Sequence, residues 1–313
     1  MKKKPLHITN GFKLKTHLDD LKIEGEKMAW QEIICEGPTI KTIHSDEFIE
    51  LRRQFLSAFY DIELDLDKVN FALEQLSNTA AYSEIVLWFN YDLFSHINMI
   101  AVINLLQQKK IELPIFLVCS GRIKGNKNLK SLNELSAGQL SKHYKDKVKL
   151  NVEDIELAET IWGIYGGKDH NLLKPYIVKS SSFKYLSNCL KAHLERFPDS
   201  LNGLNVLEKN ILELVKVNDI KSKHHLLGYA LNYQGYYGFG DMQLNAIIKK
   251  LDIFFEKKGD ALSLNKKGID ALLNKHNFSS ELNNDMMYGG INIKDFQFSK
   301  TENRLVKTIP NAN

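Results

Sequence analysis

Two short runs of almost continuously apolar residues most constrain the fold of this chain. They are "EIVLWF", residues 84–89, and "LPIFLVCSG", residues 113–121, and an amphipathic helical pattern, "DLFSHINMIAVINLLQQKK", lies between them. Strands that are covered on both faces have this composition, and a helix between two such strands implies a right-handed crossover. The pattern predicts an α/β fold with a Rossmann-like, mainly parallel sheet.

The same alternation begins near the N-terminus. "PLHIT" reads as a strand, "FKLKTHLDDLKI" has apolar residues at helical spacing, and "KMAWQEIICEGP" reads as a second strand that ends at the Gly37–Pro38 breaker. Ser45 is a good N-cap for the helical pattern over 46–62, and "DKVNFALEQLSN" continues as another helix. These elements extend the predicted Rossmann-like domain over residues 1–125.

The strand signal stops after about residue 125. Helical patterns joined by polar turns predict a helical middle region over 126–200, and "FPDSLNGLN", residues 197–205, is typical of a domain boundary. Beyond it, helices are expected at "VLEKNILELVK" and "FGDMQLNAIIKKL", followed by a strand that turns into a helix at "ALSLNKKGIDALLN". This order predicts a winged-helix-like domain over 201–313, with Asp241 as the cap of the helix that follows it.

The composition is that of a folded globular protein, but it does not indicate a function. Hydrophobic residues make up 43% and charged residues 26%, which is ordinary for a folded domain, and a net charge of +4 is too small to argue for nucleic-acid binding. No apolar stretch follows "MKKKP" or is long enough to span a bilayer, so we expect neither a signal peptide nor a membrane partner. Three widely separated cysteines, Cys35, Cys119 and Cys189, fit reduced, buried thiols in a cytoplasmic protein.

Polar residues follow each predicted strand of the sheet. In doubly wound sheets ligands bind beyond the carboxyl ends of the strands, near a switch in strand order. The positions found there are Asn10 and Gly11, then Glu32 and Glu36, then Asn90 and Asp92, then Ser120. Glu32, Glu36 and Asp92 are the candidate catalytic residues, because carboxylates in one cleft repel and one can then act as general acid. They could equally bind a cation or an amine, while Asn10, Gly11, Asn90 and Ser120 would bind the ligand.

Structural roles compete with this hypothesis. Asp92 is an ideal cap for the helix that follows it, Asn10 and Gly11 could form a simple turn, and Glu32 could point outward from a strand. Glycine-rich nucleotide motifs are absent, so the cofactor stays unknown. Asp92 and His96 have a spacing that can hold a metal, but no third ligand accompanies them, and no metal site is predicted. The remaining histidines, His44 among them, have no ligand spacing and are expected at the surface or in the core.

A DNA-binding regulator is the main alternative function. The exposed face of the helix after Asp241 would offer Gln243, Asn245, Lys249 and Lys250, whose side chains can contact base edges and phosphates. DNA would then be the partner, and the α/β domain would sense a ligand. A third alternative is a scaffold whose polar sheet edge meets a protein. The oligomeric state is not predicted.

Three motifs resemble a bacterial family, the domain of unknown function 1835, together with its C-terminal companion domain. They are "HITNG" at 7–11, "WQEIICEGP" at 30–38 and "WFNYDLF" at 88–94, and "FGDMQL", "LSLNKKGIDALL" and "YGGINI" are similar to its later segments. The chain departs from the family at Phe12, where members favour Asp, and at His96, where they usually have Gln. The resemblance implies that the recurring motifs meet at the predicted strand ends and line one pocket. The leading hypothesis is therefore a cytoplasmic protein that binds a small polar ligand in this pocket. A stronger version of the hypothesis is that the protein also catalyses a reaction of that ligand.

Overall fold

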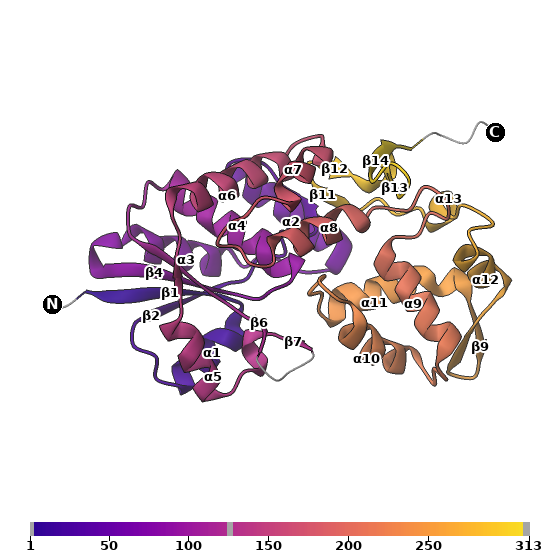
Figure 1. Ribbon diagram of the computed structural model, residues 1–313, viewed down its shortest axis with the longest axis horizontal. Helices are drawn as coiled ribbons and strands as arrows, with labels where there is room; N and C mark the ends of the chain where they lie inside the picture. The colour runs from indigo at the N-terminus through magenta and orange to yellow at the C-terminus, as the bar shows by residue number, and fades with distance from the viewer. Residues whose placement is uncertain (1–2, 124–127, 309–313) are drawn as a thin grey trace.

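A computed structural model describes residues 3–123 and 128–308 and shows an α/β architecture around a mostly parallel sheet (Figure 1). Four strands run parallel and the short edge strand β8 is antiparallel. Because β2 and β4 lie on opposite sides of β1, the strand order switches direction between β1 and β4. The spatial order is β2 (Glu26–Trp30), β1 (Lys4–Asn10), β4 (Tyr82–Phe89), β5 (Ile115–Cys119) and β8 (Val148–Lys149).

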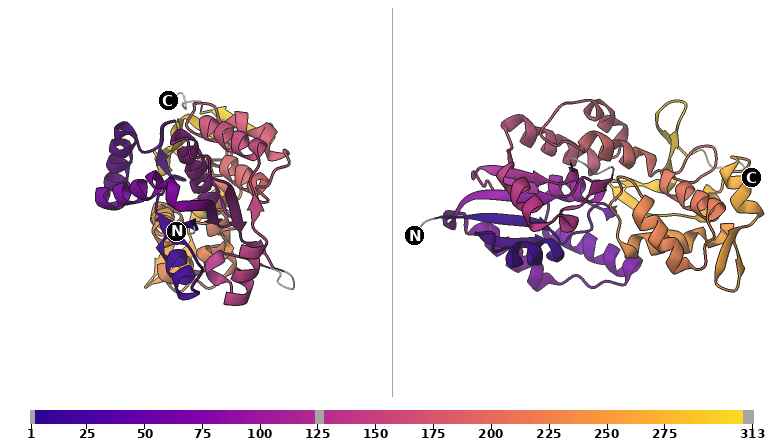
Figure 2. Two further views of the ribbon diagram at one scale, coloured as in Figure 1. Left: turned by 90° about the vertical axis from the view of Figure 1, so that its left-hand side faces the viewer. Right: turned by 60° about the horizontal axis from the view of Figure 1, so that its bottom comes forward.

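Helices cover both faces of this sheet (Figure 2). Along β4, Ile85 and Leu87 join the larger apolar cluster, whereas Val86 and Trp88 join a smaller cluster with side chains of α1 and α5. The two faces therefore alternate along the strand, as a pleated backbone requires. The covering helices are α1 (Phe12–Asp20) and α5 (Ala137–Lys145) on one face, and α4 (Leu93–Gln108), α6 (Val152–Tyr165) and α8 (Leu186–Glu195) on the other.

Helix α4 is not amphipathic as the sequence pattern indicated. Of its 16 residues 13 are buried, because α6 and α8 pack against it on the side away from the sheet. A helix that is enclosed in this way has no solvent face, and its polar residues need partners inside the protein. Asn104, for example, donates to the main-chain oxygen atoms of Ile100 and Ala158, at 2.8 and 3.2 Å.

The predicted strand over "KMAWQEIICEGP" is interrupted. Strand β2 ends at Trp30, residues 31–36 form a loop, and β3 (Gly37–Pro38) pairs with β11 (Met287–Gly289) instead of the main sheet. Arg52 stabilises the loop that leaves the main sheet, since its buried guanidinium donates to the main-chain oxygen atoms of Ile33, Glu36 and Pro38. These carbonyl groups are thus paired without a strand partner. Arg52 lies on α2 (Asp46–Tyr60), which is capped by Ser45 as predicted and is followed by α3 (Leu66–Ser77).

The middle of the chain is not purely helical. After the hairpin of β6 (Gly121–Arg122) and β7 (Leu129–Lys130), β8 joins the main sheet, and α6, α7 (Lys174–Ile177) and α8 follow. Because β8 joins the sheet and α6 and α8 pack on α4, this region is continuous with the α/β part. The predicted boundary between residues 125 and 126 lies outside the described residues.

The C-terminal part begins with three helices and a hairpin. Helices α9 (Val206–Val217), α10 (Lys223–Tyr233) and α11 (Asp241–Lys250) precede β9 (Phe255–Lys258) and β10 (Ala261–Leu264), and Ile220 bridges antiparallel to Leu262. Gly240 is the N-cap of α11, so Asp241 is its first residue and not its cap. The remaining elements are α12 (Lys266–Leu272), α13 (Ser279–Leu282), the β11–β12 (Ile291–Asn292) pair and the hairpin of β13 (Phe296–Ser299) and β14 (Arg304–Lys307).

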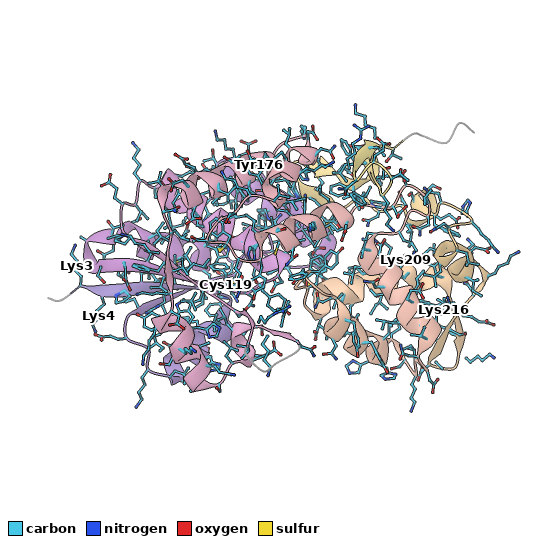
Figure 3. All side chains as sticks on the ribbon, in the orientation of Figure 1. Lys3, Lys4, Cys119, Tyr176, Lys209 and Lys216 are labelled. Carbon is cyan, nitrogen blue, oxygen red and sulfur yellow. The ribbon has the colours of Figure 1, made fainter. Side chains whose placement is uncertain are left out.

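Three further expectations can be compared with the structure. Cys35 and Cys189 are buried, Cys119 is partly buried, and all three thiols are free. Figure 3 shows Cys119 inside the α/β part and the exposed Lys3 and Lys4 at its outer end; Met1 and Lys2 of the basic N-terminal segment lie outside the described residues. Among the helices described, none combines the length and the apolar character that crossing a membrane requires.

Candidate functional site

A cavity of about 950 Å³ opens at the carboxyl ends of β1 and β2. Its walls come from the β1–α1 junction, from residues 27–33 after β2 begins, and from the face of α3 that is turned toward the sheet. Both polar and apolar side chains line it, which is the usual composition of a small-molecule site. Its lining residues include Asn10, Gly11, Glu32, His44, Phe71 and Phe94.

The β1–α1 junction gives the cavity a polar and electrically positive end. Gly11 has a φ of 95°, which an L residue rarely adopts, and its N–H donates to the main-chain oxygen atoms of Thr9 and Trp30. Asn10 donates through Nδ2 to Oγ of Ser95 at 2.8 Å, which fixes its side chain at the rim. Among the residues that the structure describes, no side chain caps the N-terminus of α1. The first N–H groups of this helix are therefore available to an anion in the cavity.

Glu32 and His44 form a second polar group in the cavity. Oε1 of Glu32 lies 3.2 Å from Nε2 of His44, and the two side chains are 9% and 5% exposed. The imidazole stacks on Trp30, with 5.3 Å between ring centroids and 5° between planes, while its Nδ1 has no hydrogen-bond partner within residues 3–123 and 128–308. A carboxylate thus orients an imidazole whose other nitrogen is buried and unpaired.

His44 was missed by the sequence analysis. No regular spacing to another His, Cys or acidic residue identifies His44 as a site residue in the sequence. Its partner Glu32 comes close to it only because of the loop after β2. The only local signal lies in its backbone, where a φ of 58° places it in the left-handed region that non-glycine residues seldom adopt. That feature is visible in the structure and not in the sequence.

Asp92 lies outside this cavity and is covered by residues 234–240. Its Oδ1 accepts from the N–H of Ser95 at 2.7 Å, so it is the N-cap of α4. The next two N–H groups, of Leu93 and Phe94, donate to the main-chain oxygen atoms of Tyr236 and Tyr237 at 2.7 and 3.1 Å. Burial raises the pKa of Asp92 to about 6. The capping role that competed with catalysis is therefore observed, and the carboxylate is not presented to the cavity.

The Asp92–His96 pair does not have the geometry of a metal site. Nδ1 of His96 contacts the main-chain oxygen of Asp92 at 3.0 Å, and burial lowers the pKa of its imidazole to about 4. Across the described ranges, no group of three or more His, Cys, Asp or Glu side chains has the arrangement that could hold a metal ion.

Glu36 is also separated from Glu32. Its Oε2 accepts a hydrogen bond of 2.5 Å from the hydroxyl of Tyr60, and burial raises the pKa of its carboxyl group. It lines a different, smaller cavity of about 270 Å³. The three carboxylates that were expected to meet at one edge are thus divided among three places, and only Glu32 lines the large cavity.

Asn90 and Ser120 hold the sheet edge together and do not line the large cavity. Oδ1 of Asn90 accepts from the N–H of Leu132 at 2.8 Å and from the hydroxyl of Ser120 at 3.3 Å. Both side chains are thereby engaged in joining the ends of β4 and β5 to the segment that leads into α5.

The four residues of the DNA-binding alternative do not share one exposed face. Asn245 and Lys249 are exposed, but Gln243 is buried, and its Oε1 accepts from the N–H of Gly240 at 3.2 Å. Lys250 forms an ion pair with the buried Glu208. Gln243 and Lys250 both line the smaller cavity that contains Glu36, so they are directed toward the α/β part.

Comparisons with known proteins add little to this description. Neither the models of protein families nor the curated proteins include a match to the chain. A search of solved structures found a likeness to the crystal structure of the Plasmodium falciparum topoisomerase II DNA-binding, cleavage and re-ligation domain, with 13% identity and a TM-score of 0.44. The likeness covers 79% of this chain and 41% of that one, so the chain spans about two fifths of its length. A TM-score below 0.5 does not establish a shared fold, and the activity of that protein is not transferred to this chain.

Proposed function

We propose that this chain binds a small polar molecule with an anionic group in the large cavity at the carboxyl ends of β1 and β2. The observation that carries the proposal is the position of Asn10, Gly11 and Glu32 together in a cavity of about 950 Å³ beside the switch in strand order. The uncapped N-terminus of α1 would receive the anionic group, because its free N–H groups and helix dipole favour negative charge. Phe71 and Phe94 would contact an apolar part of the same molecule.

The stronger form of the proposal is turnover of the ligand. The Glu32–His44 pair lines the same cavity as the positive end of α1, and an imidazole held by a carboxylate can accept or donate a proton. Glu32 would then orient the imidazole, and His44 would replace Asp92 and Glu36 as the acid or base.

The family and the domain division belong to the same proposal. Membership of the domain of unknown function 1835 family is supported by three motifs whose residues include the ends of β1, β2 and β4. A winged-helix-like module is supported by the order α9, α10, α11, β9 and β10 and by the bridge between Ile220 and Leu262. A cytoplasmic location is supported by the free thiols.

A thermal-shift screen tests the binding proposal. Inorganic phosphate, nucleotides, sugar phosphates and short carboxylates are each added to the wild type and to Asn10→Asp, which places a negative charge beside the N-terminus of α1. A ligand at 100 times its dissociation constant should stabilise the wild type by about 2.7 kcal/mol, and the variant should lose this effect. Asp92→Asn is the control, because Asp92 lies outside the cavity and its variant should keep the shift. If no anion shifts the wild type, or if Asn10→Asp responds like the wild type, the proposal is wrong.

A further inference from the structure

A second cavity, which we call the junction cavity, lies between the α/β part and the C-terminal helices. Its volume is about 270 Å³, which restricts a ligand to a small molecule. One wall comes from Glu36 and the end of α2, another from α11, and a third from residues 282–288. Five aromatic rings line it, those of Phe59, Tyr60, Tyr237, Phe239 and Tyr288.

The carboxylate of Glu36 is enclosed there without an ion-pair partner. Glu36 is 4% exposed, and Oε2 accepts from Tyr60, while within the described ranges no residue donates to Oε1 and no cation forms an ion pair with the carboxylate. Arg52 is close by, but it donates to the main-chain oxygen of Glu36 at 2.8 Å. A buried carboxylate in this state is costly unless a donor or cation reaches it.

The two cations that line the junction cavity are already engaged. Lys250 pairs with Glu208, which is 2% exposed. Arg196 donates through Nη1 to the main-chain oxygen of Cys35 at 2.6 Å and through Nε to Nδ1 of His193 at 3.1 Å, and its guanidinium lies 3.7 Å from the ring centroid of Tyr288. Neither cation is therefore presented as a free partner for an anionic ligand, whereas Glu36 offers an unused acceptor.

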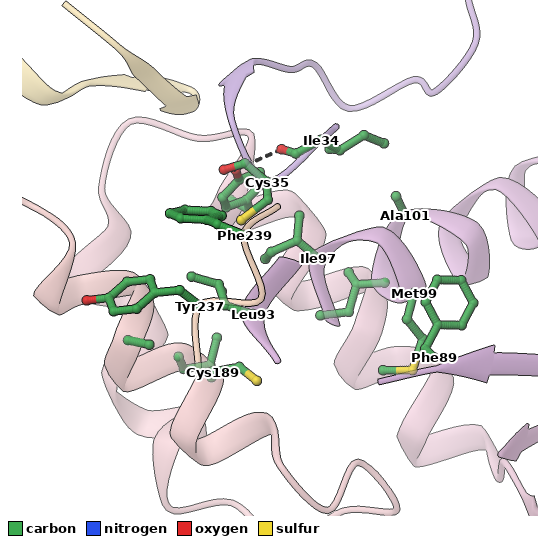
Figure 4. Close-up of a cluster of buried hydrophobic side chains, with 14 of the residues drawn as sticks. Ile34, Cys35, Phe89, Leu93, Ile97, Met99, Ala101, Cys189, Tyr237 and Phe239 are labelled. Atoms are coloured by element: carbon green, nitrogen blue, oxygen red, sulfur yellow. Dashed lines mark hydrogen bonds between the residues drawn. The ribbon is translucent and has the colours of Figure 1, made fainter. Parts of the chain in front are cut away.

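Tyr237 provides a second unused polar atom. Its hydroxyl is buried and has no hydrogen-bond partner in the described part of the chain. Figure 4 shows this oxygen directed away from the apolar side chains of Leu93 and Ile97. A hydroxyl and a carboxylate oxygen that both lack a donor, in a cavity lined by aromatic side chains, form an environment that attracts an ammonium group.

We propose that the junction cavity binds the ammonium group of a small primary amine, with Glu36 as its counter-charge and Tyr237 as a second acceptor. Aromatic side chains line the same cavity, and because Lys250 and Arg196 are engaged elsewhere, Glu36 is the buried carboxylate that faces the ammonium group. Since the walls come from both parts of the chain, the bound amine contacts the α/β part and α11 together. This site shares no lining residue with the large cavity and does not depend on the function proposed for it.

Isothermal titration calorimetry with n-butylammonium at about pH 8, where the amine is charged, tests this site. The matched probes are 1-butanol, which lacks the charge, and butyrate, which reverses it. The wild type should bind n-butylammonium and neither of the others. Glu36→Gln should weaken binding about 10-fold or more, since a charge-assisted contact is lost, and Tyr237→Phe should weaken it about 3-fold or more.

Glu256→Gln is the matched control, because Glu256 is exposed on β9 and does not line the junction cavity. It should bind n-butylammonium as the wild type does. If Glu36→Gln does not fold, Tyr237→Phe alone decides the question, as it removes a single oxygen atom. The site is refuted if the wild type binds none of the probes, if 1-butanol or butyrate binds as well as the amine, or if Tyr237→Phe and Glu256→Gln have equal effects.

Discussion

At the scale of single residues, Asp92 shows how a helix cap becomes a pH-sensitive group when it is covered. Its carboxylate accepts from Ser95 and lies beneath residues 234–240, and burial raises its pKa to about 6. The folded protein therefore favours the protonated form more than the unfolded chain does. The contribution of Asp92 to the free energy of unfolding is largest below its unfolded pKa, near 4, and is lost as the pH rises to about 6.

Asp92→Asn should remove this dependence. Asparagine is as good an N-cap as aspartate and carries no charge, so at pH 7.5 the variant should be about 2 to 3 kcal/mol more stable than the wild type. Below about pH 3 the two proteins should be equally stable, because the wild-type carboxyl group is then protonated in both states. Urea denaturation of both proteins at several pH values measures the difference, in which contributions from other groups such as His96 cancel. A difference that does not change with pH would contradict the assignment.

At the scale of elements, the segment 234–240 docks on the N-terminus of α4 through its backbone. Tyr236 and Tyr237 present carbonyl groups to α4, and Gly238 is so close that a Cβ atom there would overlap the Asp92 carboxylate. Gly235 has nearly the same backbone conformation, with a φ of 68° against 72°, but a Cβ atom there would meet nothing within 4 Å. The two glycines separate the cost of backbone strain from the cost of steric overlap.

We expect Gly235→Ala to lower the free energy of unfolding by about 1 kcal/mol, the cost of a left-handed L residue. Gly238→Ala should lower it by roughly 3 kcal/mol or more, because the segment must also move away from Asp92 and uncover the first N–H groups of α4. Urea denaturation of the two variants gives the comparison. Equal losses would show that the segment does not press on Asp92.

The helices and strands themselves were largely predictable from the sequence, whereas the tertiary contacts between them were not. The cap at Ser45 and the ends of β1, β4 and β5 depend on neighbouring residues, so local patterns locate them. Glu36 and Asp92 were assigned to one pocket because each follows an apolar run. Contacts from residues distant in sequence decide their real surroundings: Arg52 holds the loop that carries Glu36, and the segment that includes Gly238 covers Asp92.

At the scale of the whole molecule, one apolar core joins the parts that the sequence divided. The larger cluster of buried side chains runs from Leu6 and Leu87 in the sheet to Leu207 and Phe254 in the C-terminal part. The β3–β11 pair and the contact of Arg196 with Tyr288 add links between them. Figure 1 shows the yellow C-terminal strands lying beside α7 and α8 of the α/β part. Parts that share a core in this way should unfold together.

Fluorescence and circular dichroism can test this expectation on the full chain. All three tryptophans, Trp30, Trp88 and Trp162, lie in the α/β part, whereas far-UV circular dichroism also reports α9, α10 and α11. The two urea transitions should coincide in the wild type. A second transition seen by circular dichroism alone would show that the C-terminal helices unfold independently.

Arg196→Met should move both transitions together. The substitution leaves Nδ1 of His193 without its donor inside the core and removes one of the two donors to the main-chain oxygen of Cys35, the other being the Tyr165 hydroxyl. It also removes a cation that stacks on Tyr288, so a loss of about 3 kcal/mol or more is expected. Arg53→Met is the matched control, since Arg53 is exposed on α2 and should change the stability by less than about 0.5 kcal/mol. If Arg196→Met shifts only the circular dichroism transition, Arg196 stabilises the C-terminal part alone, and the two parts do not share one cooperative core.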